Sequence, residues 1–343
     1  MAKSTGYFAG ANGESGFVSY FEGALAPCKR VYILKGGCGC GKSGLMKRLA
    51  AEAEKRGEAV ERIYCASDPE SLDGVVLTER KVAVADGTAP HEISPRMPGA
   101  ADRLVNLGEF WDSARLQSRR EEIKTLTDKK QSAISRAYSL MAAQGCLEAE
   151  RQKLLEGLIL WDKMYAAARR TVKQYAAKGT EFTATVRQRC VFCSKGFVCA
   201  PDYGETRLIP LKDSLGISHL FLEQLLAAAH SKGVRVTVSP SALSPYRIGS
   251  VLFEDTEVLF SADGESREKP LNLGRFVDRK KLTSVRNTTR FLGKLNGSLR
   301  DAARLAMTES RSAHAALEDI YIPAMDFSKV DLLGDRLTEE IFA

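Results

Sequence analysis

The stretch RVYILKGGCGCGKSGLMKRLA, residues 30–50, decides the fold predicted for this chain. Four apolar residues, Val31 to Leu34, precede a glycine-rich segment, and apolar residues return at helical spacing after it. This pattern predicts a strand over 30–35, a glycine loop and a helix over 42–56. Glycines allow backbone N–H groups to turn inward around an anion, and the first turn of a helix adds the positive end of its dipole. The stretch therefore predicts a phosphate-binding loop.

The glycine loop matches the pattern GxxxxGK[ST], known as the P-loop, from Gly36 to Ser43. In such a loop the lysine, here Lys42, reaches the β- and γ-phosphates of a nucleotide, and the hydroxyl of Ser43 coordinates Mg²⁺. The residues predicted to contact the nucleotide are Gly36, Gly37, Cys38, Gly39, Cys40, Gly41, Lys42 and Ser43.

A second metal-side residue is expected where an apolar strand ends near the loop. The run Val82 to Ala85 ends at Asp86, which we predict to hold a water on Mg²⁺ together with Ser43. The plain alternative is an aspartate that ends a strand at a glycine turn. Gly87 and Thr88 follow in place of a glutamate, so hydrolysis is expected to be slow or to use a group from elsewhere in the chain.

The chain also contains an internal repeat. A shift of 177 positions pairs Ala85-Asp86-Gly87 with Ala262-Asp263-Gly264, and the segment Asn106 to Asp112 returns as Asn272 to Asp278 after a shorter connection. Such self-similarity indicates a tandem duplication. In the second copy His219 replaces the lysine and Leu220 replaces the metal-binding serine, so this copy is expected to keep the fold and to lack the ligand.

These segments resemble a family of uncharacterised bacterial proteins made of two P-loop ATPase domains in tandem. The resemblance implies nucleotide binding once per chain here, because the second loop is degenerate, and it implies no particular substrate. The matching segments are the glycine loop, Cys65 to Gly74, Asp86 to His91, Asn106 to Asp112 and Tyr321 to Phe327.

The fold class is therefore predicted as α/β, with a P-loop NTPase-type parallel sheet and flanking helices duplicated in tandem. A length of 343 residues exceeds the ~250–300 residues at which one core stops growing. Residues 1–178 are expected to form the nucleotide-binding domain, and residues 179–343 the degenerate copy with C-terminal helices.

A long helical hairpin over 112–178 is expected to belong to the first domain. Apolar residues from Leu147 to Tyr175 recur at steps of three and four, as in a coiled-coil seam, and Ala142 to Gly145 is the expected turn between its arms. Lys and Arg outnumber Asp and Glu by 14 to 8 over 112–178 and by 9 to 4 over 279–322. These basic helices are candidate contacts for nucleic acid or an acidic protein, although such a face is often merely solvated.

Two further polar segments each allow a functional and a purely structural interpretation. Asp68 and Asp73 follow the second strand, where a carboxylate can serve as the base of a small-molecule kinase, and Asp68 is the candidate for that role. The sequence Ser67-Asp68-Pro69-Glu70 is equally typical of a helix N-cap. His91 is either a γ-phosphate sensor or a polar surface residue.

The eight cysteines are expected to be free thiols, since a chain of this kind has no disulfide framework. Cys190, Cys193 and Cys199 leave a metal site open, but a fourth ligand is not evident. Cys38 and Cys40 lie at a helix N-terminus, which is expected to lower the thiol pKa.

Together these features predict a protein that binds ATP and hydrolyses it with Mg²⁺ at one site, with Lys42, Asp86 and Asp68 as candidate catalytic residues. The choice of adenine over guanine rests on the resemblance and on the lack of an Asn-Lys-x-Asp guanine motif in the sequence. Two alternatives stay open: a small-molecule kinase that uses Asp68 as its base, and a nucleotide-gated module that binds nucleic acid or protein. No apolar run of 18 residues and no signal-like pattern in Met1 to Gly16 are present, so we expect a cytoplasmic protein with no membrane partner. Assembly of several chains is compatible with the sequence.

Overall fold

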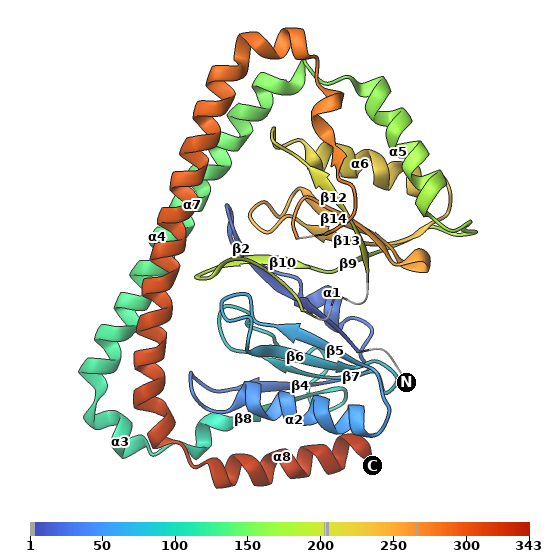
Figure 1. Ribbon diagram of the computed structural model, residues 1–343. Helices are drawn as coiled ribbons and strands as arrows, with labels where there is room; N and C mark the ends of the chain where they lie inside the picture. The colour runs from blue at the N-terminus through green and yellow to red at the C-terminus, as the bar shows by residue number, and fades with distance from the viewer. Residues whose placement is uncertain (1–3, 202, 204–205, 265) are drawn as a thin grey trace.

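The computed structural model describes residues 4–201, 203, 206–264 and 266–343. Two sheets with flanking helices form two lobes, and a pair of long helices runs along both of them (Figure 1). Within this described part, no helix combines the length and the apolar character needed to cross a bilayer.

The first sheet has six strands, and five of them run in the same direction. The exception is β6, which pairs antiparallel with both of its neighbours because only short connections join the three strands. The fully parallel sheet expected from the sequence is thus a mixed one. In spatial order the strands are β1 (Thr5–Phe8), β5 (Val60–Tyr64), β6 (Leu72–Leu77), β7 (Val82–Asp86), β4 (Arg30–Lys35) and β8 (Asp102–Asn106).

The second sheet repeats this arrangement strand for strand. In this sheet β14 pairs antiparallel with both of its neighbours, β13 and β15. In the first sheet β6 pairs in the same way with β5 and β7. In the matching spatial order the strands are β9 (Thr183–Val186), β13 (Arg235–Pro240), β14 (Ile248–Phe253), β15 (Val258–Ser261), β12 (Arg207–Lys212) and β16 (Leu271–Asn272).

Each sheet is covered by a helix that follows its second strand in chain order, β4 in the first sheet and β12 in the second. The helix α2 (Lys42–Lys55) buries Leu45, Met46 and Leu49 against the first sheet. The helix α6 (Ser218–His230) buries its apolar side against the second. The strand, loop and helix predicted for residues 30–56 are confirmed, since β4 spans Arg30–Lys35 and α2 follows the loop.

The predicted helical hairpin over 112–178 is wrong. A short helix, α3 (Ser113–Ser118), leads into a single helix, α4 (Arg120–Glu156), which continues through the expected turn because one glycine, Gly145, does not end a helix. The partner of α4 is α7 (Arg279–Tyr321), which comes from the second half of the chain. Small buried residues, among them Ala137, Ala303 and Ala306, allow the two helices to pack along their length.

The helix that follows each long helix packs in the core of the other lobe. The helix α5 (Trp161–Tyr175) buries Met164, Ala168 and Val172 in the core of the second lobe. The last helix, α8 (Phe327–Phe342), buries Val330 and Leu337 in the core of the first. The packing therefore does not follow a boundary at residue 178, because each core contains a helix from the other half of the sequence.

A β-hairpin precedes β4 in the first lobe and β12 in the second. The first consists of β2 (Gly10–Gly13) and β3 (Gly16–Ser19), followed by the short helix α1 (Phe21–Leu25). The second consists of β10 (Cys190–Cys193) and β11 (Gly196–Cys199). Short 3-10 turns complete the chain at η1 (Leu107–Phe110), η2 (Glu254–Thr256), η3 (Leu273–Phe276) and η4 (Ile322–Ala324).

The expectation of eight free thiols is wrong for two of them. Cys190 and Cys199 form a disulfide, because the antiparallel register of the second hairpin places them directly opposite each other. The other six cysteines are free.

Candidate functional site

The loop between β4 and α2 has the backbone conformation that its glycines permit. Gly39 and Gly41 have φ values of 69° and 87°, in the left-handed region where glycine has no steric penalty. Gly41 is also the residue from which α2 begins. The loop is therefore a glycine turn that leads directly into the N-terminus of a 14-residue helix, the geometry that binds phosphate.

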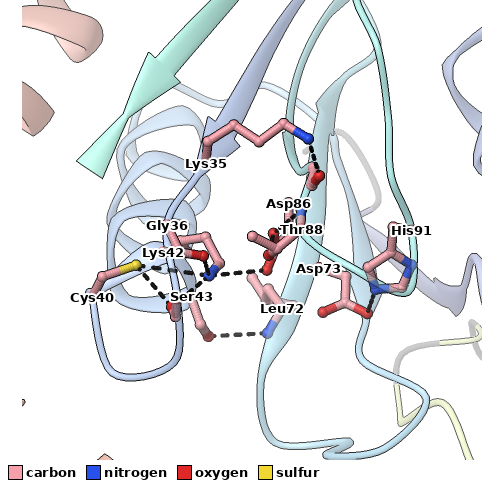
Figure 2. A network of polar contacts seen from close by, with 12 residues as sticks. Lys35, Gly36, Cys40, Lys42, Ser43, Leu72, Asp73, Asp86, Thr88 and His91 are labelled. Carbon is pink, nitrogen blue, oxygen red and sulfur yellow. Dashed lines mark hydrogen bonds and ion pairs between the residues drawn. The ribbon is translucent and has the colours of Figure 1, made fainter. Parts of the chain in front are cut away.

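Lys42 lies inside this loop and faces Asp86 (Figure 2). Its ammonium group donates hydrogen bonds of 2.8 Å to the carbonyl oxygens of Gly36 and Gly37, and lies 3.5 Å from Asp86 Oδ2. Only 12% of the Lys42 side chain and 14% of the Asp86 side chain are exposed. Sequence reasoning placed both residues at one site, and the parallel pairing of β4 with β7 brings them together.

Ser43 and Asp86 place oxygen atoms at the same end of the sheet. The Ser43 hydroxyl oxygen accepts a 3.0 Å hydrogen bond from the backbone N–H of Leu72. The other oxygen of Asp86 accepts hydrogen bonds from the N–H and the hydroxyl of Thr88, which fixes the carboxylate with Oδ2 toward Lys42. Hydroxyl and carboxylate oxygens are ligands that Mg²⁺ accepts, so these residues fit the metal that the loop implies.

A second carboxylate at this edge is Asp73, which the sequence places past the second strand together with Asp68. Asp73 precedes Gly74, which pairs with Ala85, and Asp86 follows Ala85, so the two aspartates lie at the same end of the neighbouring strands β6 and β7. Asp73 is buried, and its Oδ2 lies 2.9 Å from His91 Nε2. Its burial and its contact with His91 come from the tertiary structure.

His91 is held behind Asp73 by this contact and by aromatic rings. The rings of Phe17 and Phe21 meet the imidazole edge-on, with centroids 5.2 and 4.8 Å away. Its Nδ1 is buried and has no hydrogen-bond partner among the described residues. His91 is therefore a buried partner of a carboxylate, unlike the polar surface residue considered from the sequence.

The segment around Asp68 forms a turn, so the helix N-cap reading is wrong. Ser71 N–H donates to the Asp68 carbonyl at 2.8 Å, which closes a β-turn with Pro69 at its second position, and the strand β6 begins directly afterwards. The Asp68 carboxylate accepts a hydrogen bond from the Ser71 hydroxyl and lies 2.8 Å from Arg311 of α7. Burial tends to raise the pKa of Asp68, but its contacts with Arg311 and Ser71 outweigh burial, and the pKa is lowered.

The thiols in the glycine loop are less acidic than expected. Burial raises the pKa of Cys38 and of Cys40, and this outweighs the lowering by the nearby charges of Lys130 and Lys42. The lowered thiol pKa expected at the helix N-terminus is therefore not found, because Cys40 is buried and Cys38 is half-buried.

The loop of the second lobe is filled by its own side chain. The carboxylate of Asp213 accepts hydrogen bonds from the backbone N–H groups of Leu215 (3.1 Å), Gly216 (2.8 Å) and Ser218 (2.6 Å). His219, at the position of the lysine, is buried, and burial lowers its pKa to about 4. The chain itself thus supplies an anion to the N–H groups that would face a phosphate in an active loop.

Among the residues that the structure describes, no group of three or more His, Cys, Asp or Glu side chains is arranged to hold a metal ion. Cys190, Cys193 and Cys199 accordingly form no such cluster, and two of them are bonded to each other. Comparisons with protein-family models, with curated proteins and with solved structures found no match for this chain.

Proposed function

We propose that this protein binds Mg²⁺–ATP at the Gly36–Ser43 loop and hydrolyses it there. The observation that carries the proposal is the position of Lys42, which lies within a glycine turn at a helix N-terminus and 3.5 Å from a strand-end carboxylate, Asp86. Backbone N–H groups, a cation and a metal-side carboxylate are the parts that phosphoryl transfer requires. The choice of adenine rests on the family resemblance and on the lack of a guanine motif in the sequence.

In this proposal each side chain has a separate task. Lys42 neutralises the β- and γ-phosphates, and Ser43 and Asp86 hold the Mg²⁺ that offsets charge developing between them. Asp73, oriented by His91, is the carboxylate that positions the attacking water. No glutamate follows Asp86 to position the water. In this assignment Asp73, from the neighbouring strand, takes that role.

We further propose that the two lobes arose by duplication of a P-loop unit and that the second copy has lost its ligand. The identical strand order of the two sheets and the hairpin at the start of each support the duplication. The self-filled loop at Asp213 supports the loss. One nucleotide per chain follows from this proposal.

The geometry gives less support to the small-molecule kinase. A general base needs a free carboxylate with a pKa near the working pH, whereas Asp68 is engaged by Arg311 and Ser71 and its pKa is lowered. The nucleotide-gated binding module also loses its projecting hairpin, because α4 packs against α7.

The test compares Lys42→Ala with Lys47→Ala, a matched removal of an exposed lysine one turn further along α2. Binding of Mg²⁺–ATP is followed by calorimetry, and phosphate release is followed with and without added nucleic acid. We expect Lys42→Ala to abolish both and Lys47→Ala to retain both. Equal activity in the two variants would remove the proposed function.

A further inference from the structure

Arg311 comes from the degenerate half of the sequence, yet it lies at the site of the first half. It is on α7, and its guanidinium contacts Asp68 Oδ2 at 2.8 Å. The turn that carries Asp68 leads into Leu72, whose N–H donates to Ser43. With 40% of its side chain exposed, Arg311 retains room to move.

The face of α7 that carries Arg311 lies over the glycine loop. Arg311, His314 and Glu318 follow one another at steps of three and four residues, and such residues share one face of a helix. The end of the helix touches the loop itself, because a side chain at Gly39 would meet Ile322, the first residue of η4, at 2.8 Å.

Three cations act on this face, beside the carboxylates of Asp68 and Glu318. Burial, together with the charges of Lys130, Arg311 and Lys42, lowers the pKa of His314 to about 4 against the opposing charge of Asp68. Lys130 reaches the region from α4 and also acts on the thiol of Cys38. The side chains of the two long helices thus add cations to the one that the loop provides, which is the electrostatic environment that a triphosphate needs.

The position that corresponds to Arg311 in the other long helix is not an arginine. An offset of 166 residues relates the two long helices, since Trp111 and Val277, and likewise Ile159 and Met325, occupy matching bridges. The same offset sets Gly145 of α4 at the place of Arg311. An arginine of α4 reaches the degenerate loop from a different position on its helix, since Arg151 donates a 2.9 Å hydrogen bond to the Ser214 carbonyl oxygen.

We propose that Arg311 is a further catalytic residue of this site, and that Asp68 is the positioning residue that holds it. The inference rests on the proposed ATP hydrolysis. When the water oxygen bonds to the γ-phosphorus, the bond to the bridging oxygen of ADP breaks, and the water proton ends on the phosphate product. The guanidinium exchanges the Asp68 carboxylate for γ-phosphate oxygens and stabilises the negative charge that develops on them.

The experiment measures the affinity for Mg²⁺–ADP alone and with aluminium fluoride, which mimics the transferring phosphoryl group, together with phosphate release from ATP. Arg311→Ala and Arg311→Lys are compared with Arg290→Ala, an exposed arginine on the same helix. Wild type and Arg290→Ala are expected to bind the fluoride complex at least ~10²-fold more tightly than ADP. Arg311→Ala should bind ADP normally, lose this preference and lose turnover by ~10³-fold.

Arg311→Lys keeps the positive charge but not the planar guanidinium, so it should also lose most of the preference for the fluoride complex over ADP. If Arg311→Ala does not fold, the result for Arg311→Lys tests the role of Arg311. Asp68→Asn should bind the fluoride complex as tightly as wild type or more tightly, because the guanidinium no longer leaves a carboxylate. A general base at Asp68 would instead lose ~10²–10⁴-fold in rate.

The outcomes separate this inference from the proposed function. An Arg311→Ala variant that keeps wild-type turnover and the fluoride preference overturns the role of Arg311 and leaves ATP hydrolysis standing. A wild-type protein that binds ADP equally well with and without fluoride also overturns it. A wild-type protein that binds no nucleotide overturns both.

Discussion

Trp111, directly after η1, forms an antiparallel bridge with Met325, and this contact attaches the start of α8 to the first lobe. Ile159 and Val277 form the matching bridge at the start of α5 in the second lobe. Each lobe thus sends a long helix to the other and receives the helix that completes its own core. The proposed nucleotide site of the first half depends on this exchange, because α7 carries Arg311 to the site before the chain enters α8.

The exchange predicts that a residue in the last ten positions stabilises the first lobe. Leu337 of α8 is buried in the first core, so Leu337→Ala should lower the free energy of unfolding by about 2–5 kcal/mol. Leu332→Ala on the same helix is the control, because Leu332 is 57% exposed and should change stability little. Urea unfolding followed by circular dichroism measures both, and equal effects would contradict the assigned packing.

The self-filled loop predicts that Asp213 stabilises the second lobe without taking part in nucleotide binding. Asp213→Ala leaves three backbone N–H groups without their acceptor and should cost about 1–3 kcal/mol. ATP stoichiometry, measured by calorimetry, should stay at one per chain, because His219 and Leu220 still occupy the lysine and serine positions. A second bound nucleotide in this variant would show that the loop had only been blocked.

The burial of His219 predicts a specific loss of stability in acid. Its folded-state pKa is about 4, below the ordinary 6.5, because it is buried next to Arg247. Above pH 6.5 the histidine is neutral in the folded and the unfolded state, so it does not change the free energy of unfolding. As pH falls from 6.5 to about 4, the unfolded state takes up a proton that the folded state does not, and the free energy of unfolding falls. At about 1.4 kcal/mol per unit, this loss is on the order of 3 kcal/mol. His219→Gln should show a correspondingly flatter dependence of unfolding free energy on pH across this window, and a slope equal to that of the wild type would refute the burial argument.

The raised thiol pKa of Cys38 predicts slow alkylation at neutral pH. Because burial favours the protonated thiol, the rate should keep rising above pH 9, the ordinary value for this group. Mass spectrometry of the peptide that contains Cys38, after timed iodoacetamide treatment across a pH series, gives the profile. A rate that already levels off near pH 7 would mean that the helix N-terminus dominates.

Replacing Asp73 should slow ATP hydrolysis and leave ATP binding intact. Asp73→Asn can still accept a hydrogen bond from His91, so the fold should be retained, but it can no longer position a water as a carboxylate. Phosphate release should fall by ~10²–10³-fold while the affinity for ATP changes little. Unchanged release would assign the water to another residue.

The sequence by itself determined the local parts of the site. Glycine spacing, an apolar run and helical periodicity defined β4, the loop and α2, and they identified Lys42, Ser43 and Asp86, because each of these signals lies within a few residues along the chain. The repeat likewise showed that His219 and Leu220 replace the lysine and the serine.

Only the tertiary structure decided which surfaces meet. The apolar stripe of residues 161–175 shows that a helix has a face to bury, but it does not say that the second core covers that face. For the same reason periodicity suggested that α4 folds back on a neighbour in sequence, whereas its partner is α7, more than a hundred residues away. Asp73 beside Asp86 and Arg311 on Asp68 depend on strand register and helix exchange, and these are settled by long-range packing that no local pattern encodes.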